Sequence, residues 1–149
     1  MLTARDIMNR EVITVTEEST IKELARILTS NQISGVPVLN DSGKLVGVVT
    51  ESDLIFQTKK VHIPTMITIL DSVFYLENPS KMGEEMKKMA GSKVKDILTP
   101  SPVTVTEETP LDEIATIMSE KNFHTLPVVN NEKLVGVIGK KDIIRTLID

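Results

Sequence analysis

The chain contains no cysteine and no tryptophan, and its 149 residues include one tyrosine and three phenylalanines. Without thiols it has no disulfide framework, no cysteine nucleophile and no thiolate metal site. Few aromatic rings leave few stacking surfaces for single-stranded nucleic acid. A net charge of -4 also argues against a dedicated nucleic-acid binder. The absence of cysteine is compatible with the cytoplasm, and we expect a cytoplasmic protein that does not bind nucleic acid.

The sequence also lacks a long apolar run. The most apolar stretch, Val61 to Leu76, is interrupted by His62, Pro64 and Asp71, so it is too short and too polar to span a bilayer. The N-terminal residues contain neither an apolar run nor a small-residue cleavage site, so we expect no signal peptide and no membrane partner. With 40% apolar and 26% charged residues, the composition is that of an ordinary globular domain.

Catalytic motifs are missing as well. The Gly-Lys pairs that begin at Gly43 and Gly139 lack the upstream glycine and the following Ser/Thr of a phosphate-binding loop. There is no HExxH motif, and the presence of only two histidines argues against a transition-metal site. No candidate nucleophile sits beside an orienting base. We therefore expect no enzymatic activity, no catalytic residue and no metal.

What the chain does have is an internal repeat. Residues 5–55 and 95–144 align throughout, and both contain the runs TVTEE and KLVGV around a Pro-Val pair. Such self-similarity predicts two copies of one structural unit. We expect the first unit over residues 1–58, a partly helical linker over 59–92 and the second unit over 93–149.

Each unit is expected to fold as β-α-β-β-α. The alternating patterns at Val12–Thr16 and Val103–Thr106 predict short strands. Thr20 followed by Glu23 predicts a helix that begins with a capping box. Its counterpart is expected to begin at Thr109, with Pro110 at the first helical position.

The second half of each unit carries hairpin and helix signals. Strands over Val36–Leu39 and Lys44–Val49 flank a turn at residues 40–43, and Asn130-Asn131 plays the same part in the second copy. Helices are expected over Ser52–Thr58 and Lys141–Leu147. Because proline cannot donate to a ladder, Pro37 and Pro127 are expected at a strand start or edge.

A unit of about fifty residues buries too little apolar surface to be stable alone. We therefore predict an α+β fold in which the two units pack sheet to sheet about a pseudo-twofold axis, as in an isologous contact. This packing leaves two equivalent clefts between the repeats. Residues of a binding site should then come in pairs, one from each repeat.

The motifs at the end of each hairpin carry a family resemblance. The first copy contains Gly47-Val-Val-Thr-Glu-Ser-Asp53 and the second contains Gly136-Val-Ile-Gly-Lys-Lys-Asp142. With the Pro-Val pair before each hairpin, the chain resembles the cystathionine-β-synthase (CBS) domain family over residues 3–58 and 93–149. Two copies in tandem resemble a Bateman module. The resemblance implies a non-catalytic regulatory module that binds AMP, ADP, ATP, S-adenosylmethionine or a dinucleotide between the repeats and requires no cofactor.

The resemblance assigns residues to a first cleft. Asp53 would accept hydrogen bonds from the ribose hydroxyls, and Thr50 would face ribose or phosphate. Alternatively, Thr50 and Asp53 form a capping box, and the two roles can coexist. Val103 and Phe123 would hold the base, while His124 would face phosphate or would instead be an exposed histidine at a strand start. The remaining residues of the first cleft are Pro102, Thr104, Thr125 and Pro127.

The second cleft would be built in the same way around Asp142. In this copy Gly139 replaces the threonine, and Lys140 either attracts phosphate or is simply solvated, which we favour. The other residues of the second cleft are Ile13, Thr14, Ser34, Gly35, Val36 and Pro37. We predict unequal clefts, with the first cleft binding nucleotide more tightly.

Three further expectations concern partners. Family members often form homodimers, so we expect a homodimer here, with a regulated protein partner that acts in trans. The linker is expected to cover one face of the module or, alternatively, to form a dimer surface or a lid. The competing hypotheses are a ligand-free dimerisation or scaffold module, and a sensor of S-adenosylmethionine or a cyclic dinucleotide.

Overall fold

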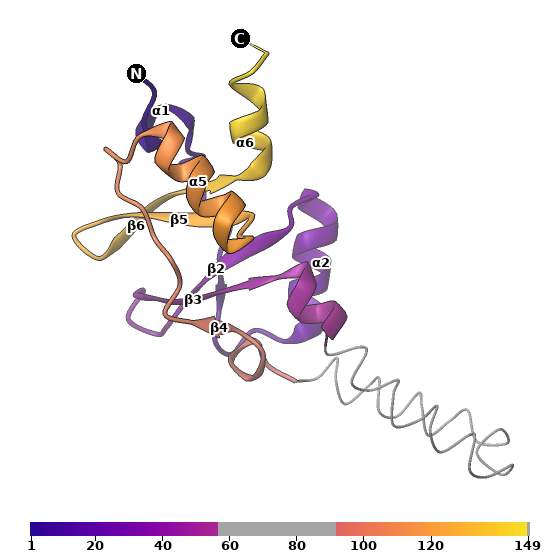
Figure 1. The fold of residues 1–149 in the computed structure, drawn as a ribbon. Coiled ribbons are helices and arrows are strands. Elements are labelled where there is room, and N and C mark those ends of the chain that lie inside the picture. The colour runs from indigo at the N-terminus through magenta and orange to yellow at the C-terminus, as the bar shows by residue number, and fades with distance from the viewer. Residues whose placement is uncertain (57–91, 149) are drawn as a thin grey trace, which may run out of the picture.

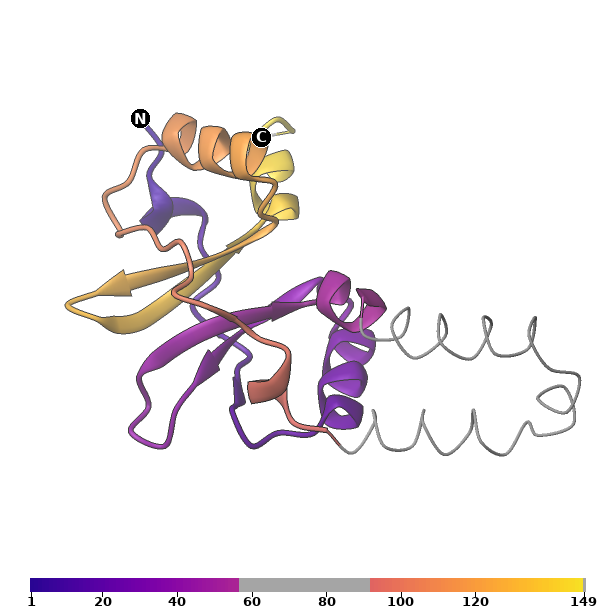
Figure 2. The same ribbon diagram turned by 60° about the horizontal axis from the view of Figure 1, so that its bottom comes forward.

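A computed structural model describes residues 1–56 and 92–148 of the chain. The predictions made for residues 57–91 therefore lie outside the described residues. The described part is an α+β fold with two repeats, as predicted. The two hairpins stack face to face and the helices lie on the outer sides (Figures 1 and 2).

The first repeat supplies most of a four-stranded sheet in the order β1-β2-β3-β4. β1 runs parallel to β2, and β2 and β3 form an antiparallel hairpin. Residues 51–56, directly after β3, are helical. The elements of this half are α1 (Ala4–Ile7), β1 (Val15–Thr16), α2 (Ile21–Asn31), β2 (Gly35–Leu39) and β3 (Leu45–Thr50).

The second repeat follows the same plan. β5 and β6 form its antiparallel hairpin, and β4, which precedes them in the chain, pairs with β3 of the first repeat. Both hairpins shift register at the same place, after Val38 and after Val128. The elements are η2 (Val94–Asp96), β4 (Thr99–Pro100), α5 (Leu111–Lys121), β5 (Thr125–Asn130), β6 (Lys133–Gly139) and α6 (Lys140–Arg145).

The two long helices begin differently. In α2 the predicted capping box is confirmed, because Thr20 Oγ1 accepts from the Glu23 amide at 3.1 Å. In α5 the prediction is off by one residue: Pro110 itself is the N-cap, and the helix begins at Leu111. The Thr109 hydroxyl is occupied elsewhere, since it accepts from the Thr106 amide at 3.0 Å.

The first strand of each repeat is shorter than predicted. β1 contains only Val15 and Thr16, and in the second repeat only Val105 pairs, as a bridge to Val128. The preceding residues leave the sheet, and Ile13 and Val103 line clefts between the repeats instead. Alternation therefore identified the buried valines correctly but overstated the length of the ladder.

Neither proline is at a strand start, but Pro127 lies in β5, at the edge of its two-stranded sheet, as predicted; for Pro37 both alternatives are wrong. Pro37 is the third residue of β2, which is an interior strand, and Pro127 is the third residue of β5. The Pro127 carbonyl accepts from the Val105 amide at 3.1 Å. The Pro127 nitrogen faces the same side of β5. The first strand of this repeat begins there only at Val105, so the missing N–H of the proline costs the sheet no hydrogen bond.

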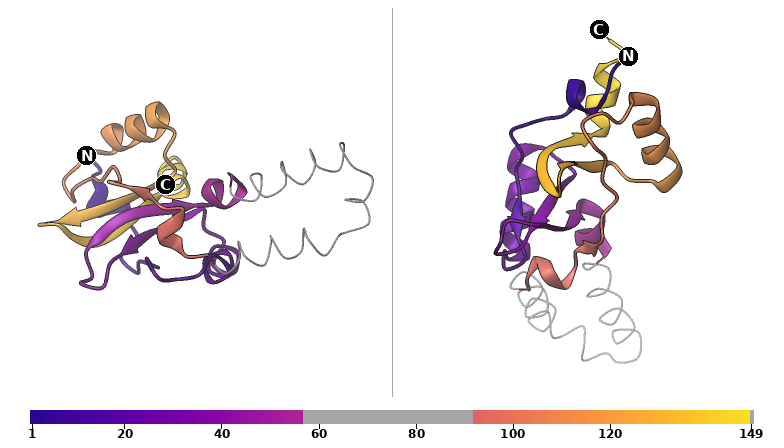
Figure 3. Two further views of the ribbon diagram at one scale, coloured as in Figure 1. Left: turned by 90° about the horizontal axis from the view of Figure 1, so that it is seen from below. Right: turned by 90° about the vertical axis from the view of Figure 1, so that its left-hand side faces the viewer.

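The short segment that opens each repeat packs on the other repeat. We call residues 3–9 and 93–99 the leaders. The first leader bonds to the second repeat, with Ala4 N donating to Thr109 O at 2.9 Å and Asn9 pairing with Val137. The second leader mirrors it, with Val94 N donating to Ser19 O at 2.8 Å. Figure 3 shows the indigo first leader beside the second repeat and the salmon second leader beside the first.

The exchanged leaders complete both hydrophobic cores. Ala4 and Met8 are buried among Ile114, Leu126 and Ile138 of the second repeat. Val94, also fully buried, lies among residues of the first repeat; these are Val15, Leu24, Leu28, Val36, Val38 and Val49. Since burial of apolar area is the main driving force for folding, neither repeat has a complete core without the other's leader.

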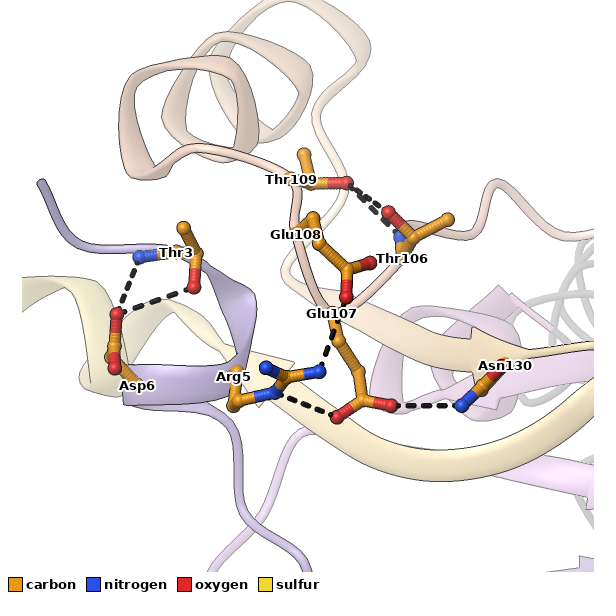
Figure 4. Close-up of polar contacts among 8 residues, drawn as sticks. All are labelled: Thr3, Arg5, Asp6, Thr106, Glu107, Glu108, Thr109 and Asn130. Carbon is orange, nitrogen blue, oxygen red and sulfur yellow. Dashed lines mark hydrogen bonds and ion pairs between the residues drawn. The ribbon is translucent and has the colours of Figure 1, made fainter.

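Ion pairs follow the same exchange. Arg5 of the first leader lies 3.1 Å from a carboxylate oxygen of Glu107 and 3.1 Å from one of Glu108 (Figure 4). These carboxylates raise the pKa of Arg5. In the mirrored position Glu18 pairs with Lys93 and Lys95, which lower the pKa of the Glu18 carboxyl. Apart from Glu107, which is 12% exposed, the partners are largely exposed, so these pairs contribute little to the free energy of unfolding.

Each leader crosses a glycine of the opposite hairpin, and this contact generates a stability prediction. A Cβ on Gly47 would lie 2.6 Å from the Thr99 carbonyl oxygen, whereas one on Gly136 would lie 2.6 Å from the Met8 sulfur. A backbone oxygen cannot move aside, but a methionine side chain can.

Gly47→Ala should therefore lower the free energy of unfolding by about 1–3 kcal/mol, and Gly136→Ala by clearly less. Urea denaturation of both variants tests this; equal losses would contradict it.

Candidate functional site

The two hairpins meet where equivalent residues face each other. A Cβ on Gly35 of β2 would lie 2.9 Å from Thr125 Oγ1 of β5. In the alignment of the two repeats, Thr125 is the residue equivalent to Gly35. Gly35 pairs across its hairpin with Thr50, and Thr125 pairs with Gly139. The pair is thus Gly/Thr in one repeat and Thr/Gly in the other. Gly35 therefore leaves room for the Thr125 hydroxyl, whereas a Cβ on Gly139 would meet no atom closer than 3.7 Å.

Two clefts flank this contact. The second cleft has a volume of about 550 Å³. The residues predicted for it that do line it are Ile13, Ser34, Gly35, Pro37, Lys140 and Asp142. The first cleft has a volume of about 430 Å³. The residues predicted for it that do line it are Thr50, Pro102, Val103, Phe123, His124 and Thr125.

Some of the predicted residues lie outside the cleft walls. Val36 and Pro127 are fully buried; side chains alternate along β2, so Val36 points into the core while Gly35 and Pro37 line the second cleft. Thr14 and Thr104 line neither cleft, whereas their neighbours Ile13 and Val103 do. The first cleft is also the smaller of the two in volume.

The two aspartates both close the start of a helix. Asp53 Oδ2 accepts from the Thr50 amide at 2.8 Å and from the Thr50 hydroxyl at 3.3 Å, so Asp53 sits behind Thr50 rather than in the cleft wall. Asp142 Oδ2 accepts from the Gly139 amide at 2.7 Å, and its Oδ1 accepts from Arg145 at 3.1 Å. Among the described residues, Asp53 Oδ1 has no protein donor and stays available, whereas both oxygens of Asp142 are engaged.

Several wall residues escaped the sequence analysis. They come in pairs that are equivalent in the two repeats. In each pair the first residue lines the second cleft and the other lines the first cleft; the pairs are Asn9 and Thr99, Glu11 and Ser101, and Gln32 and Asn122. Gln32 and Asn122 end α2 and α5 in the left-handed conformation, with φ of 52° and 56°. Neither member of any of these pairs was predicted, so projection through the repeat alignment would not have found them. It would have found two other wall residues of the second cleft, Ile33 from Phe123 and Glu51 from Lys140.

Charge is distributed unevenly between the clefts. The second cleft is lined by the cations Lys140, Lys141 and Arg145, together with the carboxylates Glu11, Glu51 and Asp142. In the first cleft the described wall contains one lysine, Lys140, one glutamate, Glu51, and His124. Such mixed walls suit a ligand that carries both anionic groups and hydrogen-bond donors. Nowhere in residues 1–56 and 92–148 do three or more His, Cys, Asp or Glu side chains gather as a metal site would require.

Comparison with known proteins identifies the fold family. The sequence profile of the CBS domain matches residues 4–59 and 94–149, which is most of the chain. No helix within the described ranges is both long enough and apolar enough to cross a membrane.

Individual relatives agree with this match. An uncharacterized protein of Methanocaldococcus jannaschii is 33% identical over 97% of this chain and 90% of its own length. The chloroplastic CBS domain-containing protein CBSX1 of Arabidopsis thaliana is 32% identical over 85% of this chain, which spans 55% of that relative. The crystal structure of CBSX2 in complex with AMP superimposes with a TM-score of 0.73 at 25% identity, covering 99% of this chain and 97% of the other.

The contact between Gly35 and Thr125 generates the second prediction. Besides Thr125 Oγ1, the Cγ2 atom of Thr50 would lie 2.9 Å from a Cβ on Gly35, whereas nothing lies closer than 3.7 Å to a Cβ on Gly139. Gly35→Ala should therefore cost about 1–3 kcal/mol of stability through overpacking. The matched variant Gly139→Ala meets no such clash and should cost less, about 0.5 kcal/mol, because alanine is a poorer N-cap of α6 than glycine. Urea denaturation measures both, and adding Thr125→Ala should recover part of the loss in Gly35→Ala. A larger loss at Gly139 would contradict the packing described.

Proposed function

Because the chain belongs to the CBS domain family, we propose that it is a regulatory module that binds an adenosine nucleotide of the AMP, ADP or ATP type in the clefts between its repeats. The observation that carries this proposal is the pair of equivalent clefts, each with an aspartate at the adjoining helix start. Their volumes, about 430 and 550 Å³, fall within the range usual for small-molecule sites. The AMP complex of CBSX2, which is similar in fold and sequence, supports the choice of ligand class.

In this proposal the first cleft binds more tightly. Asp53 Oδ1 is available to accept the ribose hydroxyls, while Arg145 occupies the corresponding oxygen of Asp142. Val103 and Phe123 supply an apolar wall for the base, and His124, exposed at the start of β5, faces the ligand from the opposite repeat. Capping and ligand binding coexist at Asp53, because the capping bonds use Oδ2 alone.

The regulatory output follows from where the ligand would sit. A ligand between the repeats contacts both of them, so it stabilises whichever relative arrangement binds it better. We propose that a protein partner acting in trans senses this arrangement. Enzymatic turnover has no place in the proposal, because the described walls hold no nucleophile beside an orienting base.

Asp53→Ala tests the ligand site directly. Losing hydrogen bonds to a charged group should cost about 1.5–3 kcal/mol, or roughly 10- to 100-fold in AMP affinity. Asp142→Ala should cost less. Isothermal titration with AMP, ADP, ATP, S-adenosylmethionine and a cyclic dinucleotide measures the affinities and ranks the ligands, and 2′-deoxy-AMP should reproduce the Asp53→Ala loss with the unaltered chain.

The matched control for capping is Asp6→Ala. Asp6 Oδ2 accepts from the Thr3 amide at 2.9 Å and from the Thr3 hydroxyl at 3.2 Å, the same arrangement as at Asp53. Thr3 lines neither cleft, however, whereas Thr50, the partner of Asp53, lines the first. Asp6→Ala should therefore lower stability without changing affinity for AMP. Equal effects of the two substitutions on AMP binding would make Asp53 a capping residue only, and no binding of any of these ligands would favour the ligand-free scaffold.

We also propose that the chain forms a homodimer through the end of α6 and the turn that follows it. Ile144, Leu147 and Ile148 expose 54%, 82% and 81% of their surface, an unusual cluster for a chain that stays monomeric. Combined Leu147→Glu and Ile148→Glu should shift the mass measured by light scattering from dimer to monomer. Lys44→Glu, in the exposed turn between β2 and β3, is the control and should leave the mass unchanged. A monomeric unaltered chain would refute the proposal.

A further inference from the structure

The two clefts share a wall. Four residues line both of them, namely Ser34, Glu51, Thr125 and Lys140. All four lie around the contact between Gly35 and Thr125, where the two hairpins meet. The clefts are therefore not two separate sites: a group that changes this wall from one side changes it for the other side as well.

Glu51 and Lys140 hold equivalent places in this wall. Each is the first residue after its hairpin, and each is fixed by a backbone hydrogen bond to the opposite end of the hairpin. Glu51 N donates to Ser34 O at 2.8 Å, and Lys140 N donates to His124 O at 3.3 Å. The backbone geometry is thus the same in both repeats, but the side chains carry opposite charges.

Neither side chain is neutralised within the described structure. Across residues 1–56 and 92–148, no hydrogen bond or ion pair is formed by the Glu51 carboxylate or by the Lys140 ammonium group. Of the residues described in the first cleft, Lys140 is the sole lysine or arginine, whereas the second cleft also has Lys141 and Arg145. Any phosphate in the first cleft therefore has one strong cation to reach, and that cation also faces the second cleft.

We propose that Lys140 is a phosphate-binding residue shared by both clefts, and that this sharing makes the module anticooperative for phosphorylated adenosine ligands. The proposal rests on the proposed function, since it assumes that both clefts bind the adenosine part. A first phosphate neutralises the Lys140 ammonium. A second phosphate then meets a wall whose remaining free charge is Glu51, together with the charge of the first ligand, so it binds more weakly. An uncharged nucleoside has no phosphate to neutralise Lys140, so its two binding events should be independent.

Single-cleft variants separate the clefts for the test. Asp53→Ala weakens the first cleft and Asp142→Ala the second, so each variant reports on the cleft that is left. Into each we place Lys140→Gln or, as the matched control, Lys141→Gln, which removes an exposed charge that lines the second cleft alone. Isothermal titration with AMP and with adenosine then measures each intrinsic affinity.

The expected results are specific. Lys140→Gln should weaken AMP binding by about tenfold in the first cleft, and by less in the second, where Lys141 and Arg145 compensate. Lys141→Gln should weaken the second cleft alone. Adenosine affinity should not change with either substitution. In the chain with both clefts intact, the second AMP should bind at least about fivefold more weakly than its single-cleft affinity, a typical size for coupling between sites.

Three outcomes would overturn the proposal. The first is that Lys140→Gln weakens AMP binding in one cleft only, which would make the lysine a residue of that cleft alone. The second is that it changes neither affinity, which would leave Lys140 a solvated side chain. The third is that the two AMP affinities of the intact chain equal the single-cleft values. Loss of binding for both adenosine and AMP is a different result, because it would refute the proposed function itself.

Discussion

The exchange of leaders between the repeats is the constraint on which the rest of the structure depends. Ala4 and Met8 belong to the core of the second repeat, and Val94 belongs to that of the first. Each leader then crosses the opposite hairpin at a glycine and continues into a cleft wall. The same segments thus close the cores, hold the hairpins face to face and supply the outer sides of the clefts. Burial, orientation and site geometry are consequences of one arrangement.

The sequence predicted most of the fold because the repeat doubled each signal. Thr20 with Glu23 identified a helix start, and the patterns before and after Gly47 and Gly136 identified the hairpins. Two local details were missed for physical reasons. Thr109 is a good N-cap in isolation, but its hydroxyl bonds to the Thr106 amide. The first strand of each repeat was predicted too long, because Ile13 and Val103 are apolar residues that line the clefts and do not belong to a sheet.

The leader exchange and the shared wall could not be predicted from the pattern. The apolar spacing of Ala4 and Met8 indicates that they are buried, but it does not say in which repeat. Likewise, the sequence places Glu51 and Lys140 at equivalent positions in the two repeats. Only the packing of the hairpins shows that each of these residues lines both clefts. The Gly/Thr pair at positions 35 and 50, inverted at 125 and 139, was visible in the alignment as a difference between copies. That Gly35 leaves room for Thr125 could be recognised only from the contact across the interface.

The exchange also bears on how the chain folds as it is synthesised. Translation proceeds from the N-terminus, so β2, β3 and α2 of the first repeat exist before Val94 does, and their core lacks a member until the second leader has been made. The first leader waits longer still, because Ile138, one of its partners, lies close to the C-terminus. Contacts this distant in sequence slow folding, because a long loop must close before they form. A ribosome that halts between the repeats would leave a chain with two unmatched apolar surfaces: a core without its leader, and a leader without its core.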